Sequence, residues 1–252
     1  MTDMPPSSTL ENVAEEGRRL AILAQQADLP LRLLGGVAVW CTCPSARVAP
    51  LTRAYGDADF VARSGDRKRI TGFLESQGYE ADRMFNALHG ASRLNFHDPA
   101  RGRPIDVLLD RFIMAHELNL ENSFTPDGIT ISLADLLMTK LQVVSINEKD
   151  VRDLTALLLD HGFGDGGIDL SRVLDATRND WGLEHTIHRS LTTLRAVLDD
   201  LALQPSQIEL VHSRIDELGG ALSHAPKSTK WKMRSRIGER VRWYEEPEEA
   251  RD

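Results

Sequence analysis

Two aspartates separated by one residue stand out in the first half of the sequence. Asp57 and Asp59 lie in a segment, 57–63, in which acidic, small and apolar side chains alternate as they do in a β-strand. Side chains two positions apart point to the same face of a strand, which places these two Cα atoms about 6–7 Å apart. Two neighbouring carboxylates repel each other unless a cation lies between them, and Mg²⁺ prefers oxygen ligands. The pair therefore predicts a magnesium site, with a solvated strand edge as the alternative interpretation.

A third acid interrupts an otherwise apolar run. Asp106 lies among the apolar residues of the predicted strand 104–109, where an isolated charge would be costly to bury. If this strand lies beside the strand 57–63, Asp106 completes a cluster of three carboxylates with Asp57 and Asp59. Such a cluster can hold two metal ions about 3.5–4 Å apart.

A pair of glycines precedes these acids by about twenty residues. Gly35 and Gly36 end the short apolar run 31–34 and begin a predicted helix. Glycines at such a turn let backbone N–H groups approach a phosphate, and the N-terminus of a helix favours an anion. An ordinary β-turn is the alternative interpretation of the glycine pair taken alone.

The elements that must position these residues fall into two halves. Strands are predicted at 31–34, 57–63, 92–96, 104–109 and 129–131, and helices at 11–26, 66–77 and from 35 to just before 44. The strands 92–96 and 104–109 are joined by turn-forming residues and should form a hairpin. From residue 132 the chain is predicted to be almost wholly helical, with helices at 132–144, 149–159, 168–179, 184–203 and 207–218. The expected fold class is α+β, with an N-terminal mixed sheet and flanking helices followed by a C-terminal helical bundle.

The ordered set of glycines and acids resembles a known superfamily. Residues 33–36, 56–60 and 105–107 are similar to the motifs of nucleotidyltransferases with the DNA polymerase β-like fold. Residues 132–141 and 149–154 narrow the resemblance to AbiEii/AbiGii-type toxin nucleotidyltransferases of bacterial toxin–antitoxin and phage-defence systems. The resemblance implies a catalytic domain at 9–131 and a helical domain at 132–226, between segments that we expect to be disordered (1–8) and basic then acidic (227–252).

The resemblance also implies a reaction and roles for the first group of residues. The chain would transfer a nucleoside monophosphate from a nucleoside triphosphate (NTP) such as ATP to an acceptor hydroxyl and release pyrophosphate. Gly35 and Gly36 would bind the triphosphate. Asp57, Asp59 and Asp106 would bind Mg²⁺, with Mn²⁺ as a substitute, and Asp106 would help to deprotonate the acceptor.

A second group of residues follows from the same resemblance. Arg53 and Lys140 would bind the nucleotide, Lys140 and Asp150 would join the catalytic set, and Asp150 or Asp153 would position Lys140. The alternatives are that Arg53 is an ordinary loop arginine, that Lys140 is a solvated helix lysine, and that both aspartates are surface charges.

The composition and net charge limit the kinds of partner that we expect for the chain. The chain has 252 residues and a net charge of −8, which excludes a uniformly basic nucleic-acid coat but leaves room for a local basic patch. No apolar stretch reaches the length of a membrane span, and we expect no membrane partner. The first residues lack a secretory pattern, and the only cysteines are Cys41 and Cys43, so we expect a cytoplasmic protein.

The end of the chain carries a local excess of positive charge. Residues 227–242 contain one acid, Glu239, and seven cations, which are Lys227, Lys230, Lys232, Arg234, Arg236, Arg240 and Arg242. Such a cluster can bind the phosphate backbone of an RNA acceptor such as tRNA. The alternative is a solvated or self-docked tail that the acidic run 245–252 balances.

The acceptor therefore stays open at the level of sequence. The toxin resemblance suggests tRNA as acceptor and a cognate antitoxin as partner. The alternatives are a small-molecule, antibiotic-modifying nucleotidyltransferase, for which the negative net charge suits a cationic aminoglycoside, and a catalytically degenerate member that binds a nucleotide or a protein.

Overall fold

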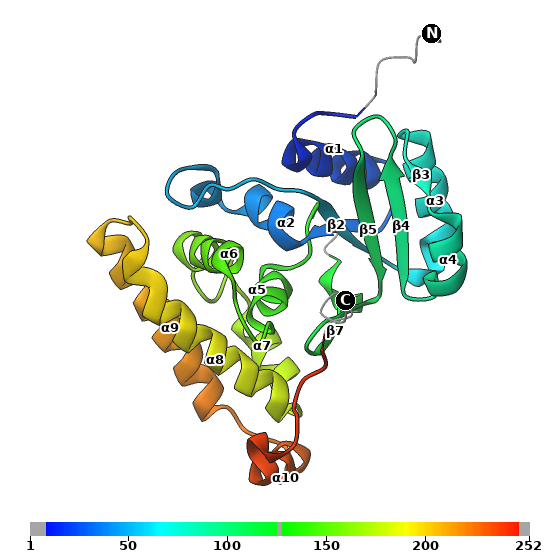
Figure 1. Cartoon of the computed structure of the whole chain (residues 1–252). Coiled ribbons are helices and arrows are strands. Elements are labelled where there is room, and N and C mark those ends of the chain that lie inside the picture. The colour runs from blue at the N-terminus through cyan, green and yellow to red at the C-terminus, as the bar shows by residue number, and fades with distance from the viewer. Residues whose placement is uncertain (1–8, 125–127, 247–252) are drawn as a thin grey trace. The chain divides into compact units, whose positions relative to one another are not determined.

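The computed structural model describes residues 9–124 and 128–246 (Figure 1). The predicted disorder of residues 1–8, and the part of the acidic end beyond residue 246, lie outside the described residues. The fold class is α+β, as predicted, with a mixed sheet, flanking helices and a C-terminal helical region. Contacts divide the chain into two compact units. Unit 1 comprises Met1–Thr42, Ala54–Phe112 and Asn119–Ser132, and unit 2 comprises Cys43–Arg53, Ile113–Leu118 and Leu133–Asp252.

Unit 1 contains a five-stranded sheet in the order β1-β2-β5-β4-β3 (Figure 1). Its strands are β1 (Leu31–Leu34), β2 (Ala58–Ala62), β3 (Glu80–Ala81), β4 (Arg93–Asp98) and β5 (Arg103–Leu109). β2 and β5 are parallel, and the other neighbours are antiparallel. The predicted hairpin is therefore confirmed as β4–β5, and the strand that carries Asp106 lies beside the strand that carries Asp59, which is the arrangement the carboxylate cluster requires.

β4 and β5 divide their side chains between a buried and a more exposed face, whereas β1 is buried throughout. Ile105, Val107 and Leu109 of β5 are buried, whereas Asp106 and Leu108 between them are partly exposed. This alternation of period two is what a strand with one face on the core requires. The apolar face packs into the core, so the acids of β2 and β5 lie on the face that is open to solvent.

Helices flank the sheet of unit 1. They are α1 (Val13–Gln26), α2 (Gly35–Thr42), α3 (Arg67–Ser76) and α4 (Arg83–His89). α1 approaches the sheet closely at Gly17, where an added Cβ would lie 2.9 Å from a methyl group of Val37 and 3.1 Å from the Cβ of Ala58. The short helix α4 and the strand β3 were not expected from the sequence. The predicted strand at 129–131 is reduced to a single bridge: the backbone carbonyl of Ile129 and the N–H of Ile131 pair with Leu33, which places Thr130 opposite Leu33.

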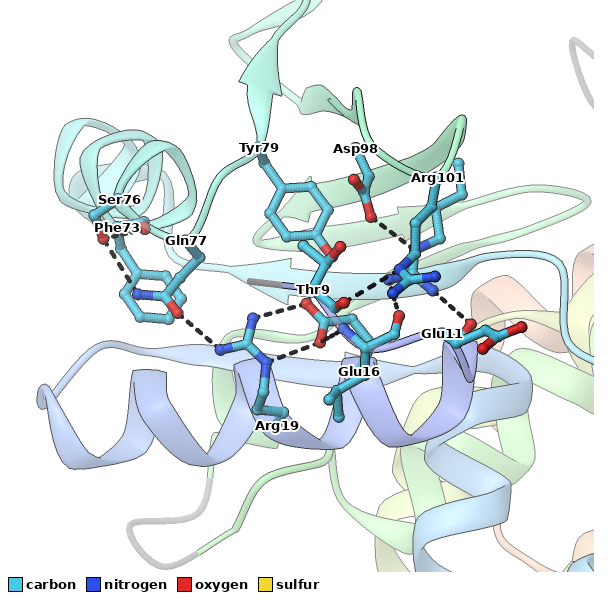
Figure 2. Close-up of polar contacts among 12 residues, drawn as sticks. Thr9, Glu11, Glu16, Arg19, Phe73, Ser76, Gln77, Tyr79, Asp98 and Arg101 are labelled. Atoms are coloured by element: carbon cyan, nitrogen blue, oxygen red, sulfur yellow. Dashed lines mark hydrogen bonds and ion pairs between the residues drawn. The ribbon is translucent and has the colours of Figure 1, made fainter. Parts of the chain in front are cut away.

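Buried polar contacts fix the start of α1 (Figure 2). Glu16 accepts hydrogen bonds from Arg19 (2.8 Å from both Nε and Nη2), from the backbone N–H of Leu10 (3.0 Å) and from the hydroxyl of Tyr79 (2.9 Å). Burial alone would raise the pKa of Glu16, but these donors outweigh it and lower the pKa. Burial and the neighbouring Glu16 raise the pKa of Tyr79. Arg101 donates to the carbonyl of Thr9 at 3.1 Å, so the β4–β5 hairpin also holds the chain ahead of α1.

Unit 2 is mainly helical. Its helices are α5 (Leu133–Leu141), α6 (Glu148–Asp160), α7 (Leu170–Thr177), α8 (Trp181–Val197), α9 (Pro205–His224) and α10 (Thr229–Ile237). Side-chain oxygens cap several of them, including Asn147 on α6, Asp180 on α8 and Ser228 on α10. A short strand pair, β6 (Arg111–Ile113) and β7 (Glu117–Asn119), contains residues of both units. Among the described residues, no helix combines the length and apolar character needed to cross a bilayer.

Candidate active site

Two of the predicted acids and one glycine meet in unit 1. Asp59 of β2 is the register partner of Asp106 of β5 in the parallel pair. Asp59 is also opposite Leu34 of β1, and Gly35 follows at the start of α2. The backbone of Gly35 has a φ of +67°, and an added Cβ would lie 2.8 Å from Oδ2 of Asp59. Only glycine combines this conformation with this close approach of a carboxylate.

Asp57 lies outside the strand that the sequence predicted to contain it. β2 begins at Ala58, and Asp57 is an exposed residue of the preceding loop. Within residues 9–124 and 128–246, no three His, Cys, Asp or Glu side chains are gathered as a metal site would need. The register thus brings Asp59 and Asp106 together, while the three-carboxylate metal site stays a prediction.

Asp106 has polar neighbours that the sequence analysis did not identify. Arg93 of β4 donates to both of its carboxylate oxygens, from Nε at 3.0 Å and from Nη2 at 2.7 Å. Asn95, its register partner on β4, donates from Nδ2 at 2.9 Å. In the predicted strand 92–96, polar residues alternate with Leu94 and Phe96. This pattern shows that the polar residues share a face, but only the β4–β5 register shows that they reach Asp106.

Gly36 follows Gly35 in α2 of unit 1, whereas Arg53, Lys140, Asp150 and Asp153 lie in unit 2, where they form a buried ion cluster. Asp153 of α6 accepts from Nε and Nη2 of Arg53 at 2.9 and 2.8 Å, and Nζ of Lys140 lies 2.8 Å from its Oδ2. Nζ of Lys140 also contacts Asp150 at 3.3 Å. The exposed fraction is 2% for the side chain of Asp153 and 14% for that of Lys140. The alternatives of a solvated Lys140 and of surface aspartates are therefore wrong.

In this cluster, each charged group stabilises the charged form of its neighbours. Burial alone would lower the pKa of Lys140, but Asp153 and Asp150 outweigh it and raise the pKa. Burial alone would raise the pKa of Asp153, but the hydrogen bonds of Arg53 and the charge of Lys140 lower it. Lys140 therefore stays protonated at neutral pH and can act as a fixed positive charge, but not as a base.

Arg152 of α6 holds the segment that ends at Arg53. Nη1 of Arg152 donates to the carbonyl of Pro50 at 2.7 Å and to that of Thr52 at 3.0 Å. Two neighbouring positions of α6, 152 and 153, thus fix the backbone and the side chain of the same short segment. Arg53, whose side chain is 13% exposed, is therefore held both through its backbone and through its side chain.

The basic C-terminal segment is partly engaged within unit 2. Lys227 donates to Glu184 and to the carbonyl of Leu222, and Arg234 lies over the ring of Trp181 at 4.9 Å. Arg242 pairs with Glu246 at 3.0 Å. Within residues 227–242, the exposed cations that pair with no acid of the described chain are Lys230, Lys232, Arg236 and Arg240.

Comparisons with known proteins give matches to structures alone. No protein-family model and no curated protein matches the chain. The fold is similar to the lincosamide antibiotic adenylyltransferase LnuA in its lincomycin-bound structure, with 17% identity, coverage of 58% of this chain and 97% of that chain, and a TM-score of 0.41. It is also similar to the antibiotic-resistance factor ANT(2'')-Ia, with 12% identity, coverage of 82% and 94%, and a TM-score of 0.34. A third match is an antigenic nucleotidyltransferase-like protein from Paracoccidioides brasiliensis, with 12% identity, coverage of 88% and 96%, and a TM-score of 0.41. TM-scores this low do not assign the chain to a family or to the activity of any of these proteins.

Proposed function

We propose that the chain transfers a nucleoside monophosphate from an NTP to an acceptor hydroxyl and releases pyrophosphate. The observation that carries this proposal is the in-register pair of Asp59 and Asp106 beside Gly35. Two acids on neighbouring parallel strands, next to a glycine turn that opens a helix, provide ligands for a cation and donors for a phosphate at one place.

The carboxylate oxygens of unit 1 are of the ligand type that magnesium prefers. Asp59 offers carboxylate oxygens beside Gly35, whose missing Cβ lets Oδ2 of Asp59 lie close to its backbone, and Asp57 stands two residues earlier on an exposed loop. We propose that Asp57, Asp59 and Asp106 hold the metal. When bound, the metal would supply positive charge against the triphosphate and the departing pyrophosphate.

The glycine turn supports binding of the triphosphate. Gly35 and Gly36 are the first residues of α2, and the first N–H groups of a helix have no partner within that helix. These groups, together with the positive end of the helix, favour an anion. Because neither residue has a side chain, a phosphate can approach the backbone directly.

The ion cluster of unit 2 supports a positioning role for its acids. Arg53 and Lys140 remain the proposed nucleotide-binding cations, and both contact Asp153. We propose that Asp153 and Asp150 keep these cations fixed in their orientation. A charged group whose orientation is already fixed does not have to reorganise when negative charge develops in the transition state, so no energy is spent on that reorganisation.

We propose RNA, such as tRNA, as the acceptor, with the chain acting as a toxin that a cognate antitoxin restrains in the cytoplasm. Lys230, Lys232, Arg236 and Arg240 support this acceptor. Because they are exposed and have no acidic partner among residues 9–124 and 128–246, they can contact phosphates without breaking an ion pair there. Lys227 and Arg234 contribute less, because contacts within unit 2 already engage them.

A transfer assay tests the proposal. Each of the four NTPs, labelled at the α-phosphate, is incubated with the protein, Mg²⁺ and total RNA, protein or an aminoglycoside, with and without EDTA. We expect the label to move to RNA in the presence of Mg²⁺ and to fail to move with Asp59→Ala or Asp57→Ala. Glu75→Ala, an exposed acid of α3, is the matched control that should keep the activity.

The outcomes separate the alternatives. Label on the aminoglycoside would support a small-molecule, antibiotic-modifying enzyme in place of the RNA acceptor. Label on no acceptor with any NTP would overturn the transferase and leave a nucleotide- or protein-binding member of the fold.

A further inference from the structure

The carboxylate of Asp106 is nearly saturated by its neighbours. A carboxylate has about four lone-pair sites for hydrogen bonds or metal coordination. Oδ1 accepts from Nε of Arg93 and Nδ2 of Asn95, and Oδ2 accepts from Nη2 of Arg93. Only about one site, on Oδ2, is left for a metal ion or an acceptor hydroxyl.

The guanidinium of Arg93 is held in place from several sides. Its two donors form a bidentate pair with Asp106, the geometry that makes arginine–carboxylate contacts strong and directional. The ring of Phe85 lies 5.8 Å from the guanidinium carbon. The exposed fraction is 35% for Arg93 and 20% for Asp106, so the pair is only partly accessible to water. A contact with this support differs from a mobile surface ion pair.

The neighbouring strand is fixed as well. Asn86 of α4 accepts from the backbone N–H of Asn95 at 2.7 Å and donates to its carbonyl at 3.0 Å. These bonds tie α4 to β4 at the position directly opposite Asp106. The donors that surround Asp106 are therefore part of a prepared arrangement that includes both strands and one helix.

We propose that Arg93 takes the place of a second metal ion beside Asp106, so that this site binds one divalent cation instead of two. The inference rests on the proposed function. The single ion is the one proposed above for Asp57, Asp59 and the remaining site of Asp106, and the guanidinium supplies the second positive charge. A second ion at Asp106 would have to approach a guanidinium of like charge or displace it from a bidentate pair, and both are unfavourable.

Counting bound metal ions tests this assignment without measuring turnover. Protein saturated with α,β-methylene-ATP is titrated with Mn²⁺, and free Mn²⁺ is followed by electron paramagnetic resonance. We expect one tightly bound ion per wild-type protein. Arg93→Met and Arg93→Gln should each bind a second ion at least about tenfold more tightly than the wild type does, because the repelling cation is gone.

Two further variants serve as controls. Arg93→Lys keeps the positive charge and should keep the count at one. Arg93→Met combined with Asp106→Asn should lose the second ion, which shows that Asp106 binds it. Far-ultraviolet circular dichroism and thermal melting confirm that each variant is folded before its ions are counted.

The number of bound ions decides between the role of Arg93 and its alternatives. Two tight ions in the wild type, or one ion in both Arg93→Met and Arg93→Gln, would overturn the role of Arg93 and leave the proposed function intact. No bound ion in the wild type would contradict the metal-dependent function itself, and the assignment of Arg93 would fail with it.

Discussion

Replacement of Asp153 by asparagine should destabilise unit 2 strongly. Asp153 is 2% exposed and contacts both Arg53 and Lys140. The change removes the carboxylate charge that faces both cations. Removal of one partner of a buried ion pair costs about 3–5 kcal/mol. We expect a loss of about 3 kcal/mol, the lower end of that range, because Lys140 keeps its contact with Asp150 at 3.3 Å.

Urea unfolding followed by tryptophan fluorescence measures this loss. Three of the four tryptophans, Trp181, Trp231 and Trp243, lie in unit 2, so the signal reports mainly on the unit that the change affects. The free energy of unfolding of the wild type and of Asp153→Asn is compared at pH 7, 5 and 3.

The pH dependence has a definite sign. Because the pKa of Asp153 is lowered on folding, its stabilisation is complete above the ordinary value near 3.8 and is lost as the pH falls through the lower, folded-state value. The difference between wild type and variant should therefore be the same at pH 7 and 5 and smaller at pH 3.

Asp135→Asn is the matched control. Asp135 of α5 is 1% exposed, and its ion pair is with Arg172, whose side chain is 27% exposed. Arg172 can turn to water when the carboxylate is removed, so this variant should lose less stability than Asp153→Asn. A loss below about 1 kcal/mol for Asp153→Asn, or a loss no larger than that of Asp135→Asn, would refute the reasoning about the cluster.

Three further changes test other parts of the structure. Gly35→Ala should reduce transfer more than tenfold, because the left-handed backbone costs about 1–2 kcal/mol and the new methyl group collides with Asp59; unchanged steady-state kinetics would contradict this. Glu16→Gln should cost about 3 kcal/mol in urea unfolding, since four donors converge on this buried carboxylate; a loss below about 1 kcal/mol would show that the contacts contribute little. Burial lowers the pKa of His116, so the stability of the wild type should fall as the pH drops below about 6.5, and His116→Gln should flatten that slope; equal slopes would refute the assignment.

The part of the site that depends on local patterns could be predicted from the sequence. Gly35 follows a buried strand and precedes a helix, and Asp59 and Asp106 each interrupt an apolar alternation. One assumption, that their strands are neighbours, brings them together, and the register of β2 and β5 confirms it. The predicted strand begins at Asp57, one residue before β2 begins at Ala58. The alternation of side chains does not mark where a ladder of hydrogen bonds starts.

The partners of these residues could not be predicted in the same way. Arg53 and Asp153 are 100 positions apart, and their contact depends on how α6 packs against the segment 43–53. Arg93 and Asn95 lie on a strand whose register with β5 fixes their contact with Asp106. Such contacts between distant residues arise from tertiary packing and leave no periodic signal in the chain.

The position of β5 in the sheet has a consequence for folding. β5 comes last of the five strands along the chain, yet it lies between β2 and β4. Until it inserts, β1–β2 and β3–β4 are separate halves, and closing the long connection between β2 and β5 carries an entropic cost that slows such non-local pairing. The step that completes the sheet is therefore also the step that brings Asp59 beside Asp106. A nascent or partly unfolded chain lacks this acid pair, so the proposed activity would arise only in molecules whose sheet has closed.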